Sequence, residues 1–177
     1  GHSAGIGFAA YCELLEDTIN RLQNGDTPKE TQLEPVMEIK LDAYIPNNYI
    51  ENPRYKLEIY RRLGEMVYGE SNDLLDEIID RFGNPPKEVE NLWKLAKLKG
   101  LCRQMGVQGI TIGQGEIRVT FGKHSLANPD AIMQLVRKNV PRIWLKTGPA
   151  TQLIIKRMVI GKSDPIIWLE KQLTAML

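Results

Sequence analysis

"QGITIGQGEIRVTFG" (residues 108–122) is the stretch that decides the fold class of this chain. It holds two runs in which apolar and polar side chains alternate, as they do in strands with one buried face. The glycine-rich turn 113–115 between the runs predicts a β-hairpin. Because this turn joins two strands rather than a strand to a helix, its likeness to a nucleotide-binding loop is only superficial.

The chain before this hairpin is predicted to be mainly helical, since apolar side chains recur there every three or four residues. Asn52 and Pro53 suit the start of one helix, Gly83 the end of another, and Gly106 the end of a third. The helix that starts at Asn52 is expected to direct Tyr55, Ile59 and Leu63 or Met66 inward. Helices are expected over about residues 8–23, 52–66, 72–82 and 86–105, and a short strand within 36–46.

After the hairpin, Asn128 and Pro129 predict the start of another helix, and Ser163 or Asp164 with Pro165 the start of a closing helix. Two further strands are expected within 142–148 and 152–160. The predicted class is therefore α+β, a helical N-terminal half followed by a small antiparallel sheet packed with helices. A subdivision near residue 106 is left open.

The composition argues against a membrane or secreted protein and shows an uneven distribution of charge. The 177 residues are 42% hydrophobic, enough for a sizeable core, without an apolar run that would cross a membrane or a recognisable signal peptide. Cys12 and Cys102 lie far apart and predict free thiols in an intracellular protein. Residues 1–90 hold 18 acidic and 9 basic side chains and residues 91–177 hold 4 and 14, which indicates a charged partner or one half facing the other.

The segment 72–82, "NDLLDEIIDRF", raises the main functional question. Its carboxylates are spaced by three and four residues, so a helix would align them on one face, with the apolar residues on the other. Three interpretations are open: a solvated face, a protein-binding face, or a general acid–base pair formed by Glu77 and Asp80. The aligned acids are Asp73, Asp76, Glu77 and Asp80, and the apolar residues are Leu74, Leu75, Ile78, Ile79 and Phe82.

Motifs for other chemistry are missing from the sequence. It has no phosphate-binding Gly-x-x-x-x-Gly-Lys-Ser/Thr loop and no Cys or His pairs at zinc-ligand spacing. His2 lies in the terminal segment, and His124 is expected in a solvated loop after a strand. ATP hydrolysis and zinc binding are therefore not expected of this chain.

The basic second half raises a nucleic-acid hypothesis, although no DNA-binding motif organises its cations. Lys94, Lys97, Lys99 and Arg103 are expected on one side of the long helix, and Lys156 and Arg157 in a strand. Solvated faces are the alternative interpretation.

Four ordered motifs resemble the C-terminal domain of bacterial transcription-repair coupling factors. The resemblance is strong over residues 1–106 and is one of pattern over 107–177. It implies that 1–23 continue an upstream motor module and that 24–177 form the C-terminal regulatory domain. The motifs are "IGFAAYCELLEDTI" (6–19), "DAYIPNNYI" (42–50), "LEIYRRL" (57–63) and "IIDRFGNPPKEVENLW" (78–93).

The resemblance implies a non-catalytic regulatory domain in a cytoplasmic parent that is an ATP- and magnesium-dependent translocase on double-stranded DNA. The parent would bind stalled RNA polymerase and recruit the damage-recognition subunit of nucleotide-excision repair. The domain would fold onto the parent's N-terminal module, mask the recruiting surface and restrain the motor. In this resemblance Asp76, Glu77, Asp80 and Arg81 form the interdomain interface, with no cofactor or metal in the fragment. The alternative is an accessory DNA-binding domain that supports the motor.

Overall fold

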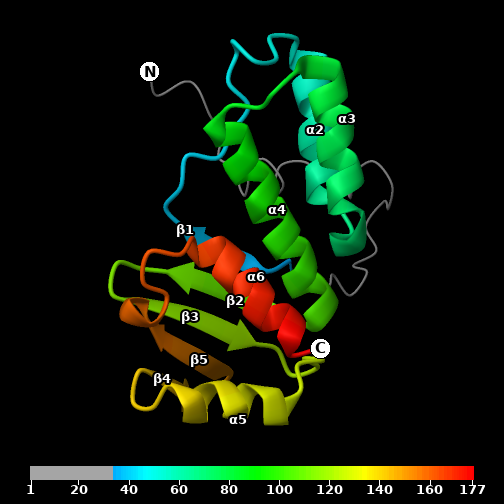
Figure 1. Cartoon of the computed structure of the whole chain (residues 1–177). Helices are drawn as coiled ribbons and strands as arrows, with labels where there is room; N and C mark the ends of the chain where they lie inside the picture. Colours follow the sequence, from blue (N-terminus) through cyan, green and yellow to red (C-terminus); the bar gives the residue numbers. More distant parts are fainter. Residues whose placement is uncertain (1–33) are drawn as a thin grey trace. The chain divides into compact units, whose positions relative to one another are not determined.

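The computed structural model describes residues 34–177, and the chain divides into two compact units (Figure 1). Residues 41–100 form a helical unit, and residues 34–40 with 101–177 form a unit built on a β-sheet. The predicted α+β class is confirmed. The helix predicted over 8–23, with Cys12 and His2, lies outside the described residues. No helix among residues 34–177 is long and apolar enough to cross a membrane.

Two antiparallel helices, α2 and α3, form one side of the helical unit (Figure 1). Their direction follows from two contacts, because Tyr55 at the start of α2 meets Phe82 at the end of α3, and Arg62 later in α2 meets Glu77. The helices of this unit, with the short 3-10 helix η1, are α2 (Pro53–Gly64), η1 (Tyr68–Glu70), α3 (Ser71–Phe82) and α4 (Lys87–Met105), whose last residues belong to the second unit.

The helix ends follow from local chemistry. The Asn52 side chain accepts a hydrogen bond of 2.9 Å from the backbone N–H of Arg54, which caps α2 as predicted. Gly83 has a φ of 84° and donates its N–H to the Ile79 carbonyl oxygen at 2.8 Å, ending α3 as predicted. In contrast, no side chain caps the start of α3.

The loop before α2 is tied to the helices by buried polar contacts. The Tyr60 hydroxyl accepts a hydrogen bond from the Ile45 N–H at 2.9 Å, and the Asn91 side chain donates to the Asp42 carbonyl at 3.0 Å. The prediction that Tyr55 faces inward is wrong, because 40% of Tyr55 is exposed. Its position in the first turn of α2 places its ring against the end of α3 instead. The other inward residues are confirmed as buried: Ile59, Leu63 and Met66.

The second unit contains a five-stranded sheet of order β1-β2-β3-β5-β4. The predicted hairpin is confirmed as the antiparallel pair β2–β3, but the sheet is not wholly antiparallel, because β1 pairs with β2 in parallel. β5 is also shorter than predicted, since the chain turns into the 3-10 helix η2 after Lys156. The elements are β1 (Val36–Ile39), β2 (Val107–Ile112), β3 (Glu116–Phe121), α5 (Pro129–Lys138), β4 (Ile143–Lys146), β5 (Thr151–Lys156), η2 (Arg157–Val159) and α6 (Pro165–Ala175).

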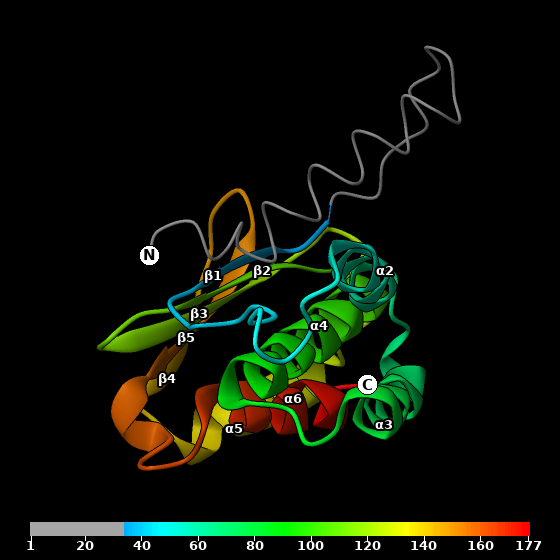
Figure 2. The ribbon, with the colours of Figure 1, turned by 90° about the horizontal axis from the view of Figure 1, so that it is seen from above.

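One face of this sheet is apolar and lies on the side of α5 and α6 (Figure 2). The register places Ile117 opposite Ile155 and Val119 opposite Leu153, and all four side chains are at most 1% exposed. Asp164 caps α6 through its carboxylate, which accepts hydrogen bonds from the next helical N–H groups. Successive residues of a strand point to opposite faces, so the other face carries Arg118, Thr120, Gln152 and Lys156 together with Trp144 and the buried Ile154.

Candidate functional site

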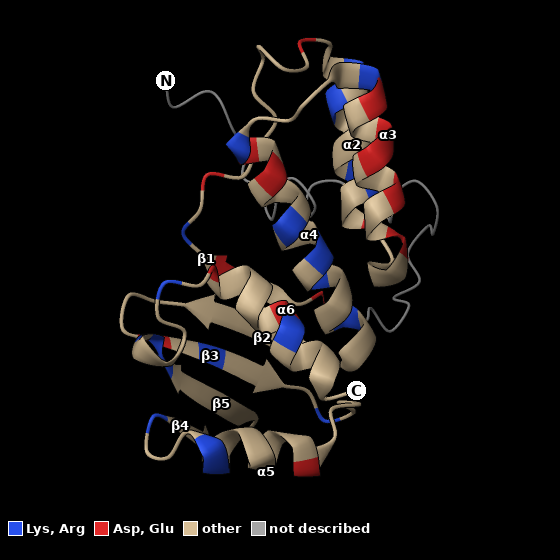
Figure 3. Ribbon diagram, viewed as in Figure 1, with Lys and Arg blue, Asp and Glu red and all other residues tan. Residues whose placement is uncertain are grey.

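The acidic residues of α3 form a continuous exposed row. Asp73, Asp76, Glu77 and Asp80 are all exposed, and Figure 3 shows the row along the outside of the helix. Leu74 and Ile78, on the other side of α3, are 6% and 3% exposed. The structure therefore brings the four predicted carboxylates together on one solvent-facing surface, which we call the α3 acidic row.

One member of the row already has a partner. Nη2 of Arg62, on α2, lies 2.5 Å from Oε2 of Glu77. This hydrogen bond and the accompanying charge attraction lower the pKa of Glu77 and raise the pKa of Arg62. Because both side chains are partly in water, the pair adds little stability. Glu77 is thus partly neutralised within its own unit.

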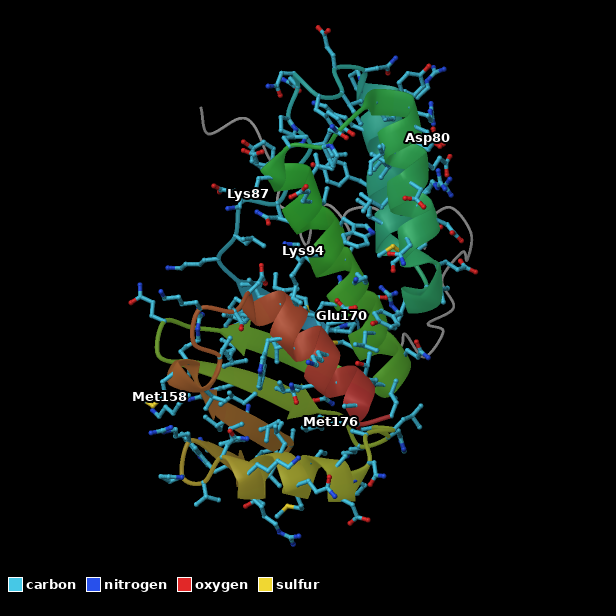
Figure 4. The ribbon with its side chains drawn as sticks, viewed as in Figure 1. Asp80, Lys87, Lys94, Met158, Glu170 and Met176 are labelled. Carbon is cyan, nitrogen blue, oxygen red and sulfur yellow. The ribbon has the colours of Figure 1, made fainter. Side chains whose placement is uncertain are left out.

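Asp76 and Asp80 differ from Glu77 in this respect. Neither carboxylate forms an ion pair or hydrogen bond within residues 34–177. Asp80 stands near the C-terminal end of α3, where Figure 4 labels it. Asp73 likewise forms no such contact within residues 34–177, so the three aspartates are the members of the row best able to accept hydrogen bonds from a basic partner.

Arg81 is held by aromatic rings beside the α3 acidic row. Its guanidinium carbon lies 5.2 Å from the centre of the Tyr55 ring and 5.1 Å from that of Phe82, within cation–π range. The Tyr49 hydroxyl donates a 2.7 Å hydrogen bond to the Gly83 carbonyl, which fixes the end of the helix. This packing orients the exposed Arg81 next to Asp80 and adds one cation to a mostly anionic surface.

The arrangement suits binding rather than acid–base catalysis. Catalytic carboxylate pairs need unequal, sheltered environments that separate their pKa values, whereas all four acids here face solvent. Cys102 is not a nucleophile candidate either, because burial raises the pKa of its thiol to about 12 and keeps it protonated at neutral pH. Of the two interpretations that remain, a solvated face and a protein-binding face, the second would use the row to attract a positively charged surface.

The basic side predicted for α4 is largely engaged within the chain. The Lys97 ammonium lies 4.4 Å from the centre of the Trp93 ring, and Arg103 pairs with Glu34 at 2.7 Å. Lys99 is only 7% exposed, contrary to the expected solvated position. His124 is exposed in the loop after β3, as predicted.

Comparison with known protein families identifies the family of this chain. Residues 39–132, just over half of the chain, match the TRCF domain. The chain belongs to the TRCF domain family. This match includes the whole α3 acidic row, and it confirms the resemblance found in the sequence motifs.

Curated relatives of this TRCF domain are named transcription-repair-coupling factors. The Bacillus subtilis protein is 39% identical over 126 residues, which are 71% of this chain and 11% of that protein. The Myxococcus xanthus protein is 33% identical over 140 residues, 78% of this chain and 12% of that protein. The chain thus spans only about a tenth of these relatives' length.

The fold also resembles a crystal structure of the C-terminal domain of transcription-repair coupling factor. The TM-score is 0.66 at 22% identity, and the match covers 81% of this chain and 89% of that one.

Sequence reasoning missed two features of the site in this TRCF domain. Nothing in the spacing of α3 indicates that Arg62, 15 residues before Glu77, is its partner. The sequence also does not predict the contact between the Arg81 guanidinium and the Tyr55 ring, because the helical pattern places Tyr55 on the inward side. Both contacts depend on how α2 packs beside α3, which local periodicity does not determine.

Proposed function

We propose that this chain is a non-catalytic regulatory domain of a transcription-repair coupling factor. It binds the N-terminal module of the same protein through the α3 acidic row and masks the surface that recruits the excision-repair damage-recognition subunit. In this position it restrains the DNA translocase until stalled RNA polymerase is bound. The observation that carries the proposal is the exposed, unpaired state of Asp76 and Asp80 beside the oriented Arg81.

The chemistry of the row suits a contact that must be released. Exposed charge pairs contribute modestly and respond to salt, so a competing partner can displace them. A ligand shifts such an equilibrium by its differential affinity for the open and closed states. The counterpart on the N-terminal module is therefore expected to present arginines or lysines.

The remaining parts of the proposal concern the parent protein. It hydrolyses ATP with magnesium, moves on double-stranded DNA, and works in the cytoplasm, while this domain holds no cofactor. These properties are proposed from the family, whose curated members are about ten times longer than the region matched here.

The test is to measure, by isothermal titration calorimetry, the affinity of the 177-residue chain for the isolated N-terminal module of its parent. Reversing the charge of two of the unpaired aspartates, Asp76→Lys with Asp80→Lys, should weaken binding by roughly 2–5 kcal/mol, because two cations then face a basic surface. Glu77→Gln should cost less than the aspartate changes, since Arg62 already neutralises part of the Glu77 charge.

The matched control reverses two other exposed acids of the same unit, Asp42→Lys with Glu51→Lys. It changes net charge equally but leaves the α3 acidic row intact, so affinity should stay close to that of the unchanged chain. Equal affinity of the Asp76/Asp80 variant and the unchanged chain, with both folded by circular dichroism, would rule out this surface as the interface.

A further inference from the structure

The face of the sheet opposite α5 and α6 carries an exposed aromatic residue near its β4 edge. Ile143 and Leu145 point to the apolar face, so Trp144 between them points to the other. Its cross-strand neighbour is Ile154, and 36% of the Trp144 residue surface remains exposed. The indole therefore offers part of a flat aromatic surface to solvent.

Three cations surround this indole. Lys146 follows Trp144 by two residues in β4, which puts it on the same face, and the exposed Arg142 ends the turn immediately before the strand. The Lys156 ammonium lies 5.5 Å from the centre of the Trp144 ring, and its backbone N–H donates to the Arg142 carbonyl at 2.9 Å. We call Trp144, Arg142, Lys146 and Lys156 the Trp144 patch.

The charge of the Trp144 patch is not compensated locally. Within residues 34–177, no carboxylate pairs with Arg142, Lys146 or Lys156. Glu116 lies opposite Lys156 in the sheet register, but its carboxylate binds Arg118 at 2.9 Å. The whole sheet unit, residues 34–40 and 101–177, holds twelve basic and six acidic side chains.

Two further cations precede β4 in the chain, on the side of the sheet where α5 lies. Arg137 and Lys138 end α5 and are both exposed. Figure 3 shows these basic residues at the end of α5 beside the β4 edge of the sheet. The Trp144 patch itself therefore combines a flat aromatic surface with three nearby cations, Arg142, Lys146 and Lys156.

We propose that the Trp144 patch binds single-stranded nucleic acid, with a base stacked on the indole and phosphates held by Arg142, Lys146 and Lys156. Aromatic platforms flanked by cations bind single strands in this way, because every base has a π-face and every linkage a charge. The Lys156 ammonium occupies the position over the ring that a base would take. Its flexible side chain can turn to an adjacent phosphate when the base enters.

Two other ligands fit the patch less well. A duplex keeps its bases stacked inside, so it would use the cations and leave the indole without a role. An acidic peptide would likewise need only the cations. The Trp144 patch lies in a different unit from the α3 acidic row and shares no residue with it. Its test therefore does not depend on whether the proposed regulatory function is correct.

The test is a fluorescence anisotropy titration of the 177-residue chain with labelled oligothymidylate and oligouridylate of about 12 nucleotides, within the range of known single-strand site sizes. Contact of three cations with phosphates predicts a slope of log K against log salt of about −2, or roughly a 20-fold loss between about 50 and 200 mM salt. Comparison of the two oligonucleotides distinguishes DNA from RNA as the preferred strand.

Variants separate stacking from charge. Trp144→Ala should weaken binding about tenfold, from the usual contribution of one stacked base, whereas Trp144→Phe should retain most of it. Arg142→Glu with Lys146→Glu should abolish binding at the higher salt concentration. The matched control, Lys123→Glu with Lys171→Glu, changes net charge equally at two exposed sites outside the patch and should lose far less.

Three results would each overturn the proposal. They are the absence of binding to either oligonucleotide at low salt, unchanged affinity of folded Trp144→Ala, and equally tight competition by a duplex or by polyglutamate. Tight, stacking-dependent binding that the patch variants lose and the control variant keeps would establish it. Indole fluorescence quenching that disappears in Trp144→Phe would locate the stacked base.

Discussion

At Gly106 the backbone has a φ of 77°, a left-handed conformation that a side chain makes costly. A Cβ atom there would also lie 3.0 Å from the Ser125 Cα and 3.1 Å from the His124 carbonyl oxygen. Gly106→Ala should therefore destabilise the protein by at least the ~1–2 kcal/mol of the left-handed conformation. The measurement is the urea midpoint of the folded chain.

Gly69 provides the control for this substitution. No atom lies within 4 Å of a Cβ built there, and its φ is not in the left-handed region. Gly69→Ala should leave stability unchanged or raise it by up to about 1 kcal/mol, through the unfolded chain. If both alanine variants unfolded at the same urea concentration, the strain assigned to Gly106 would be wrong.

Residues whose role depends on their immediate neighbours were predictable from the sequence. Asn52, Asn128 and Asp164 each accept a hydrogen bond from a backbone N–H two residues later, and each precedes a proline. Residues whose role depends on another element were not predictable. Arg62, Trp144 and Arg142 acquire their surroundings only when α2 meets α3 or β4 meets β5.

At the scale of elements, α3 divides into an acidic outer side and an apolar inner side. Leu74 is 6% exposed, whereas its neighbour Leu75 is only half-buried. Leu74→Ala should lower the free energy of unfolding by about 2–5 kcal/mol, because it leaves a cavity, and Leu75→Ala should cost clearly less. Thermal and urea unfolding of the two variants measures this difference.

This pair also serves as a check on binding experiments with the α3 acidic row. Leu75→Ala keeps the row and most of the packing, so it should bind the N-terminal module like the unchanged chain. A larger loss of stability in Leu75→Ala than in Leu74→Ala would mean that the helix faces its core differently. The sequence could not rank the two leucines, because both fall on the apolar side of the helical pattern.

The sheet shows the same limit of sequence reasoning. Alternation predicted the strands β1, β2 and β3, and strands were also expected where β4 and β5 lie, but the sequence does not encode which strands pair or in which direction. The parallel pairing of β1 with β2 joins residues about 70 positions apart, with Val36 opposite Gly109. Gly109 suits this contact, since a Cβ atom there would lie 2.9 Å from the Val36 carbonyl oxygen.

At the scale of the whole molecule, charge is distributed by unit. Residues 41–100 hold eleven acidic and nine basic side chains, and the sheet unit holds six and twelve. Within residues 34–177, Asp73, Asp76 and Asp80 of α3 form no ion pair, and neither do Arg142 and Lys146 beside Trp144. Two surfaces of opposite charge suit two different partners, a basic protein module and a nucleic acid strand.

The regulatory proposal leads to a prediction for the full-length parent. If the α3 acidic row holds the parent closed, Asp76→Lys with Asp80→Lys should raise the open population, because losing roughly 2–5 kcal/mol of interface energy shifts that equilibrium more than tenfold. Binding of the damage-recognition subunit should then increase in a pull-down without polymerase, and ATP turnover on DNA should rise in the same preparation. The parent carrying Asp42→Lys with Glu51→Lys should behave like the unchanged protein.

The result that would contradict autoinhibition through α3 is unchanged recruitment and unchanged ATP turnover in a folded Asp76/Asp80 variant of the parent. This would hold even if the isolated domain bound the module, because that contact would then not restrain the parent.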